Sequence, residues 1–126
     1  MIAKSLEDLQ VFQQALEAAD AVSAILDHSG FRQEPELRNQ IAECRSRIPA
    51  LISEGFGQKT DRHCAHYQYL ARGSANEIRA HFAVACGKRC ISVAERDDLS
   101  KRYVSIGKRL TRWIQHLERE NRSRRG

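Results

Sequence analysis

The sequence contains few of the residues that make turns, with only seven glycines and two prolines among 126 residues. Loop-rich and all-β proteins use both residue types in their many turns, so this scarcity argues against those classes and favours helices joined by short connections. No apolar run approaches the roughly 20 residues that a membrane-spanning helix requires. The first ten residues turn acidic at once, whereas a signal peptide continues from basic residues into an apolar segment. We therefore expect a single-domain cytoplasmic protein with no membrane partner.

Patterns that hold metals or activate nucleophiles are also missing. The four cysteines and five histidines form no Cys-x-x-Cys pair and no pair of Glu-x-x-His motifs, which are the spacings that zinc sites and di-iron bundles use. No glycine-rich phosphate loop follows a strand-like segment, and Ser74 has the spacing of a core residue. We therefore expect no catalytic residues, no metal and no cofactor. The cysteines are expected to be reduced thiols that act as small apolar residues.

The first two helices are predicted from apolar spacing and from residues that start or end helices. Ser5 and Asp8 have the spacing of a capping box and begin a first helix of about twenty residues, which ends near the sequence DHSG. Pro35 begins the second helix, because proline is tolerated in a first helical turn. Glycine commonly ends helices, so the sequence GFG at 55–57 marks the end of the second helix.

The third and fourth helices carry clearer caps. Thr60 or Asp61 caps the third helix, which ends near the sequence CGKRC. Ser92 and Glu95 form a capping box at the start of the fourth helix. Its apolar residues follow in heptad order: Leu99, Tyr103, Ile106, Leu110, Trp113 and Leu117. The prediction is an all-α, antiparallel up-down-up-down four-helix bundle over residues 1–121, followed by a basic C-terminal tail over residues 122–126.

Pro49 lies inside the second helix without disturbing its apolar period. The apolar residues of this helix are three and four residues apart: Ile41, Cys44, Ile48 and Ile52. Proline removes one backbone hydrogen bond and crowds the carbonyl of Arg45, which costs about 3 kcal/mol in a straight helix. Since the period continues on both sides, we predict one helix that is kinked at Pro49.

The first helix carries two apolar stripes, which together cover roughly half of its circumference. One stripe has the larger residues and is expected to face the core: Leu9, Phe12, Leu16, Ala19 and Leu26. The other stripe lies off this seam: Val11, Ala15, Ala18, Val22 and Ile25. This second stripe fits either a wide core contact with two neighbouring helices or a surface between the subunits of an oligomer. On the subunit interpretation, a charged residue at Val22 or Ala18 dissociates the oligomer before it unfolds the protomer.

Positive charge is concentrated towards the end of the chain. Residues 1–30 hold one lysine against five acids, whereas residues 99–126 hold nine basic residues and two acids. At about 100° per residue, four cations of the fourth helix fall within roughly 40° of one another, opposite its apolar seam. These four are Lys101, Lys108, Arg112 and Arg119. No acid occurs between Leu99 and Leu117, so we expect a positive stripe about 27 Å long rather than a face laced with salt bridges.

A positive stripe without acids suits a phosphate backbone. The candidate nucleic-acid-binding residues are Lys101, Arg102, Lys108, Arg109, Arg112, Arg119 and Arg122. Trp113 has core spacing, so we do not expect it to stack on bases, and binding should depend weakly on nucleotide sequence. The alternatives are that this face contacts an acidic protein or is only solvated.

Two sequence blocks resemble the four-helix-bundle family encoded in intervening sequences of bacterial 23S rRNA. The blocks are QIAECRSRIPALISEGFG and YLARGSANEI, and SLEDLQVFQQA resembles the opening of that family. The matching residues with structural or interaction roles are Gln40, Ile48, Pro49, Glu54, Gly55, Arg72, Gly73, Ser74 and Glu77. The resemblance implies a cytoplasmic protomer that assembles as a ring-like homopentamer and has no known enzymatic activity. A related bundle, the accessory protein of diversity-generating retroelements, binds nucleic acid and a reverse transcriptase.

The chain departs from the family pattern after Gln-Ile, where Ala42 and Glu43 replace a basic pair. Arg45 and Arg47 lie one turn later and are candidates to replace that pair, with Glu77 of the third helix as a partner. We therefore predict a non-enzymatic, oligomeric bundle that binds RNA or another nucleic acid through the last helix. The alternative is a scaffold bundle that binds proteins and no nucleic acid.

Overall fold

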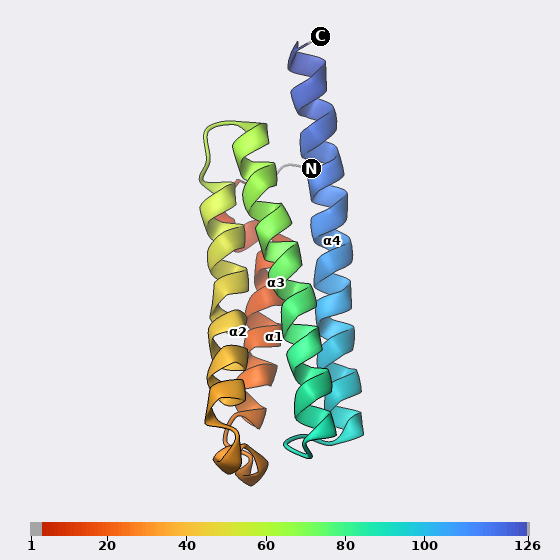
Figure 1. Cartoon of the computed structure of the whole chain (residues 1–126). Helices are drawn as coiled ribbons and strands as arrows, with labels where there is room; N and C mark the ends of the chain where they lie inside the picture. Colours follow the sequence, from red (N-terminus) through yellow and green to blue (C-terminus); the bar gives the residue numbers. More distant parts are fainter. Residues whose placement is uncertain (1–3, 126) are drawn as a thin grey trace.

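The computed structural model describes residues 4–125 and consists of four long helices. They are α1 (Gln10–Ile25), α2 (Pro35–Phe56), α3 (Asp61–Gly87) and α4 (Val93–Arg125), with short 3-10 helices η1 (Leu6–Asp8) and η2 (Ser29–Gln33) before α1 and α2. Consecutive long helices run in opposite directions (Figure 1). Helix α1 packs against α2 and α4, and α3 packs against the same two helices. The predicted all-α four-helix fold is confirmed, and no strand occurs within residues 4–125.

Three of the predicted helix starts are confirmed, two of them by the groups that cap them. Pro35 is the first residue of α2. The backbone N–H of His63 donates to the Thr60 hydroxyl at 3.2 Å, so Thr60 caps α3. At the start of α4 the capping box is reciprocal: Ser92 N donates to Glu95 Oε1 at 2.9 Å, and Glu95 N donates to Ser92 Oγ at 3.0 Å.

The start of the first helix differs from the prediction. Ser5 Oγ donates to Asp8 Oδ2 at 2.9 Å and caps no backbone N–H. Residues 6–8 therefore form a separate 3-10 turn, and the α-helix begins only at Gln10. Helix α1 has 16 residues, which is shorter than expected.

Of the two interpretations of the second apolar stripe on α1, the structure supports the wide core contact with two neighbouring helices. The stripe that was a candidate oligomer interface is buried inside the protomer: Val11, Ala15, Ala18, Val22 and Ile25. Within the other stripe Leu26 is buried, but Leu16 is 45% exposed. The physical reason is close packing, because small side chains such as Ala15 and Ala18 let α1 approach both α2 and α4. The prediction of a subunit surface on the Val22 side of α1 is therefore wrong.

The prediction of the buried seam of α4 is correct except at one position. Its buried residues are Leu99, Tyr103, Ile106, Leu110, Ile114 and Leu117. Trp113 is only partly buried and packs against the edge of the core. Successive buried residues are four, three, four, four and three positions apart, which keeps to the 3.6-residue period of a straight α-helix. A strict heptad has a period of about 3.5 residues and drifts away from this face over several turns. Trp113 is thus not the core residue that the heptad predicted.

Helix α2 continues through Pro49 as one helix, as predicted. On both sides of the proline, Cys44, Ile48 and Ile52 are fully buried. The apolar face of α2 therefore stays on the core across the missing backbone hydrogen bond. The bend at Pro49 stays a prediction.

Helix α4 extends to Arg125, so residues 122–125 continue the helix where a frayed tail was expected. Gly126 lies outside the described residues. In Figure 1 the C-terminal turns of α4 project beyond the other three helices. Near this end Arg124 Nη1 forms an ion pair with Asp61 Oδ2 at 2.7 Å, which connects α4 to the start of α3.

All four cysteines are free thiols. Cys44 is fully buried and donates its S–H to the Ser74 carbonyl at 3.1 Å. Burial raises the pKa of Cys44 to about 11, so the reactive thiolate is scarce at neutral pH. Within residues 4–125, no cluster of three or more His, Cys, Asp or Glu side chains could hold a metal ion. No helix in the same range combines the length and apolarity needed to cross a bilayer.

Candidate nucleic-acid interface

Four cations of α4 form what we call the basic face: Lys101, Lys108, Arg112 and Arg119. All four are exposed, on the side of α4 that faces away from the buried seam. In the part of the chain that the structure describes, none of them has a carboxylate within ion-pair distance. Their charges are therefore available to an external anion.

The other three candidate cations have different surroundings. Arg102 Nε forms an ion pair with Asp98 Oδ2 at 3.2 Å, one turn earlier on α4. Arg109 is half-buried and donates from Nη1 to Gln10 Oε1 of α1 at 2.8 Å. Arg122 is exposed and lies in a hollow that Glu118 and Asp61 also line. The absence of acids between Leu99 and Leu117 thus did not keep Arg102 free of a partner, because Asp98 lies just outside that interval.

The basic face continues into a groove between α3 and α4, which we call the α3–α4 groove. Its volume is about 460 Å³. Four cations line it, Arg72 and Arg79 from α3 and Lys108 and Arg112 from α4, and no carboxylate is among the lining residues. Asn76 and Thr111 add neutral hydrogen-bonding groups to its walls. The arrangement concentrates positive charge in a concave surface, where field lines focus and attract anions.

Arg72 is held in place by two neighbours, Thr111 and Tyr69. Its Nη1 donates to Thr111 Oγ1 at 3.2 Å, and its guanidinium carbon lies 4.9 Å from the centre of the Tyr69 ring. The Tyr69 hydroxyl in turn donates to Glu118 Oε2 at 3.0 Å, a hydrogen bond that raises the pKa of Tyr69. Stacking and hydrogen bonding leave the remaining N–H groups of Arg72 as donors at the edge of the groove.

Gly107 leaves the α4 wall of the groove open. A Cβ atom added to Gly107 would meet no other atom within 4 Å. A larger side chain therefore fits at this position, which is one of the lining residues of the groove. Gly107 is thus a position where the charge of the groove can be changed without removing any of its cations.

Residues 7–112 match the sequence family of 23S rRNA-intervening sequence proteins. The chain belongs to this family. The crystal structure of a protein of unknown function from the S23 ribosomal protein family of Bacteroides thetaiotaomicron has a similar fold, with a TM-score of 0.73 and 19% sequence identity to this chain. The similarity covers 82% of this chain and 97% of that one. No curated protein matches the chain.

The match places much of the candidate site inside the region that defines a 23S rRNA-intervening sequence protein. All four cations of the α3–α4 groove lie within residues 7–112. Arg119 and Arg122 lie beyond it, in the last turns of α4. The groove therefore lies within the matched range, whereas the last cations lie outside it.

The nine motif residues of this 23S rRNA-intervening sequence protein are divided between the core and the surface. Ile48, Gly55 and Ser74 are buried, and Pro49 is partly buried. Gln40, Glu54, Gly73 and Glu77 are exposed. Arg72 is the motif residue that lines the groove.

Glu77 has the partner that the sequence predicted. Arg47 Nη1 of α2 lies 3.3 Å from Glu77 Oε1 of α3, and His81 Nε2 lies 3.2 Å from the other oxygen. Arg45 has a different role, since its Nη1 donates to Ser23 Oγ of α1 at 2.6 Å. Arg47 thus links α2 to α3, one turn after Ala42 and Glu43, which replace the basic pair of the family pattern.

Sequence analysis of the last helix alone missed the α3 half of the site. Arg72 was recognised only as a motif residue, and Arg79 was not selected. The two arginines are seven residues apart, which is two helical turns and places them on the same side of α3. Asn76 lies between them on that side. This spacing is the signal in the sequence that could have located the second wall of the groove.

Proposed function

We propose that this protein is a non-enzymatic, oligomeric bundle that binds RNA or another nucleic acid through the basic face and the α3–α4 groove. The observation that carries the proposal is the convergence of four cations from two helices on one groove that no carboxylate lines. Lysine and arginine side chains in such an array contact phosphates, which position a nucleic acid without reading its sequence. The expected ligand is therefore a phosphate backbone, bound with weak sequence preference.

The proposed assembly is a cytoplasmic homo-oligomer, and the resemblance to the family suggests five subunits. Because the Val22 side of α1 is buried in the protomer, the subunit contacts would use other apolar residues. Leu16 on α1 and Leu70 and Val84 on α3 are 44–46% exposed. Light scattering coupled to size exclusion should give a multiple of 14.4 kDa, and a monomer at micromolar concentration would contradict this part of the proposal.

A second candidate function is a protein-interaction scaffold that binds no nucleic acid. The observation in its favour is the exposure of Leu70 and Val84 on the same helix, since exposed apolar side chains are found at protein contacts. The absorbance ratio at 260 and 280 nm of protein purified in low salt distinguishes the two functions. The nucleic-acid proposal expects a high ratio that falls after nuclease treatment, and the scaffold expects a protein-like ratio throughout.

The groove is tested most specifically by changing its charge at Gly107. Gly107→Glu places a carboxylate among the four cations, and Gly107→Gln places an uncharged side chain of the same shape there. We expect Gly107→Glu to weaken binding of a fluorescent 20-nucleotide RNA roughly tenfold more than Gly107→Gln does. Helical content should be kept in both, because glycine is the less favourable residue in a helix. Equal affinities of the two variants would contradict binding in the groove.

A further inference from the structure

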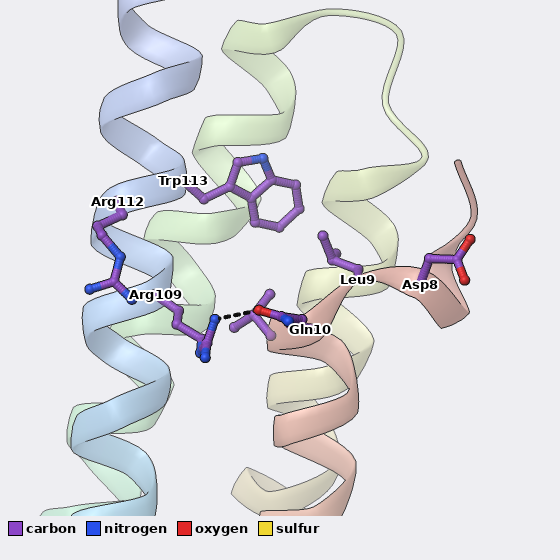
Figure 2. A pocket seen from close by; sticks show the side chains of 7 residues that line it. Asp8, Leu9, Gln10, Arg109, Arg112 and Trp113 are labelled. Carbon is purple, nitrogen blue, oxygen red and sulfur yellow. Dashed lines mark hydrogen bonds between the residues drawn. The ribbon is translucent and has the colours of Figure 1, made fainter. Parts of the chain in front are cut away.

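Trp113, the single tryptophan of the chain, lies beside the basic face rather than in the core. Together with the start of α1 it forms a pocket of about 320 Å³, which we call the Trp113 pocket. In Figure 2 the indole of Trp113 extends from α4 towards Leu9, and Arg109 lies below it, hydrogen-bonded to Gln10. Arg112 lines both this pocket and the α3–α4 groove. The two sites are therefore adjacent and share one cation.

The walls of the Trp113 pocket are apolar and its edge is polar. Trp113, Leu9 and Val11 supply the apolar surface, and Gln10 and Arg109 supply donors. The hydrogen bond from Arg109 Nη1 to Gln10 Oε1 at 2.8 Å fixes both side chains. It uses only one N–H of the guanidinium, so other Arg109 N–H groups and the Gln10 amide N–H groups remain as donors.

We propose that the Trp113 pocket binds one unpaired nucleobase of a single-stranded nucleic acid, while Arg112 binds an adjoining phosphate. This inference rests on the proposed function and names the form of nucleic acid that the site takes. Aromatic side chains next to cations are the usual platform for single strands, because every base has a face that can stack. In a duplex the bases are already stacked and paired, so only a single strand can place a base in the pocket.

The lining of the pocket favours a nucleotide over an apolar peptide. Asp8 is among the lining residues, but its carboxylate accepts a hydrogen bond from Ser5 Oγ at 2.9 Å and points away from Trp113 in Figure 2. An apolar peptide would cover the guanidinium groups of Arg109 and Arg112 without giving them a partner, which is costly. A neutral base joined to a phosphate satisfies the stacking surface and the cations together.

The single tryptophan makes the inference directly measurable. We would titrate the intact protein with four probes of equal length: oligo(rU), oligo(dT), an abasic oligonucleotide and an RNA duplex. Quenching of Trp113 fluorescence by the two single strands, with little change for the abasic strand and the duplex, is the expected result. Equal quenching by oligo(rU) and oligo(dT) would mean that the pocket recognises the base and not the sugar. Stronger quenching by oligo(rU) would mean that the pocket prefers RNA to DNA. Equal quenching by the abasic strand would overturn the inference.

Substitution of Trp113 provides the second measurement, in which binding is followed by anisotropy of labelled oligonucleotides. Trp113→Leu should weaken binding of oligo(rU) roughly tenfold and leave binding of the abasic strand unchanged, whereas Trp113→Phe should keep part of the affinity. Val93→Ala, which trims an exposed apolar side chain at the other end of α4, is the control and should bind as wild type. If Trp113→Leu binds oligo(rU) as wild type does, the inference fails but phosphate binding stands. If wild type binds none of the four probes, the proposed function fails as well.

Discussion

Gly55 of α2 lies so close to Gln68 of α3 that no side chain fits between the two helices. A Cβ atom on Gly55 would be 2.2 Å from Gln68 Nε2 and 2.7 Å from Tyr67 Cβ. Gln68 is fully buried, and its Nε2 donates to the Ile52 carbonyl at 3.3 Å. The glycine of the family motif is therefore required by the close contact of α2 and α3.

Gly55→Ala is expected to lower the free energy of unfolding by about 1–3 kcal/mol, because the added methyl group must displace Gln68 or Tyr67. Urea denaturation followed by circular dichroism measures the change. Gly73→Ala is the matched control, since a Cβ atom there would meet nothing within 4 Å. In an exposed helix position alanine is favoured over glycine, so Gly73→Ala should raise the free energy of unfolding by about 0.5–1 kcal/mol. A rise in the free energy of unfolding of Gly55→Ala like that of Gly73→Ala would show that the contact at Gly55 is not close.

Val22→Asp should unfold the protomer rather than dissociate an oligomer. Val22 has no exposed surface, and a carboxylate placed there without a partner costs about 3 kcal/mol or more. Leu16→Asp on the exposed side of the same helix should keep the fold, because that position is 45% exposed. Circular dichroism and thermal unfolding of both variants test this. A folded Val22→Asp monomer would restore the interpretation of that stripe as a subunit surface.

Helix α1 shows what the sequence could and could not decide. Both of its apolar stripes have helical spacing, and the stripe with the larger residue Leu16 was expected to face the core. The structure buries Ala15 and Ala18 instead, because the separation of α1 from its neighbours depends on the packing of all four helices. Local spacing thus predicted the helix and its apolar character, but not which of two stripes is innermost.

The same limit applies to the candidate site. The cations of α4 were predicted from their spacing on one helix. Their pairing with Arg72 and Arg79 depends on how α3 is rotated against α4, which no single helix encodes. Trp113 was misplaced by one position, because the heptad pattern and the true helical period separate towards the end of a long helix. The capping box of Ser92 and Glu95 was predictable in full, since it needs only residues three apart.

Glu95 should make the stability of the fold dependent on acid pH. Its carboxylate accepts a hydrogen bond from Ser92 N at 2.9 Å and contacts His28 Nε2 at 2.6 Å. Both contacts lower the pKa of Glu95, and the hydrogen bond from Ser92 has the larger effect. The stabilisation is complete above the ordinary glutamate pKa of 4.5 and is lost as the pH falls through the lower pKa of the folded state.

In Glu95→Gln we expect the free energy of unfolding at pH 7 to fall by roughly 0.5–1 kcal/mol. The difference from wild type should shrink as the pH is lowered from about 5 to 3. Urea denaturation of both proteins across this range is the measurement. A difference that is equally large at both ends would mean that the charge of Glu95 contributes nothing.

Pro49→Ala should leave the bundle folded and change only the course of α2. The helix already continues from Pro35 to Phe56 through the proline, and alanine restores the backbone N–H that proline lacks. Circular dichroism should show unchanged or slightly higher helical content, and a crystal structure of the variant should show a straighter α2. Loss of folding or of much of the helical signal would contradict the prediction that α2 is one helix with a kink at Pro49.

The central claim, that the basic face binds a phosphate backbone, is tested most directly by the salt dependence of RNA affinity. Four engaged cations predict a slope of about −3 per protomer in a plot of log K against log salt, because each neutralised phosphate of a single strand contributes about −0.7. Reversing two of them in Lys108→Glu/Arg112→Glu should weaken binding to unrelated RNA sequences alike and make the slope shallower by at least about 1.4. Glu17→Lys, which changes an exposed charge on α1, is the control. No binding by wild type at about 50 mM salt, or equal binding by the double reversal, would show that the basic face is only a solvated surface.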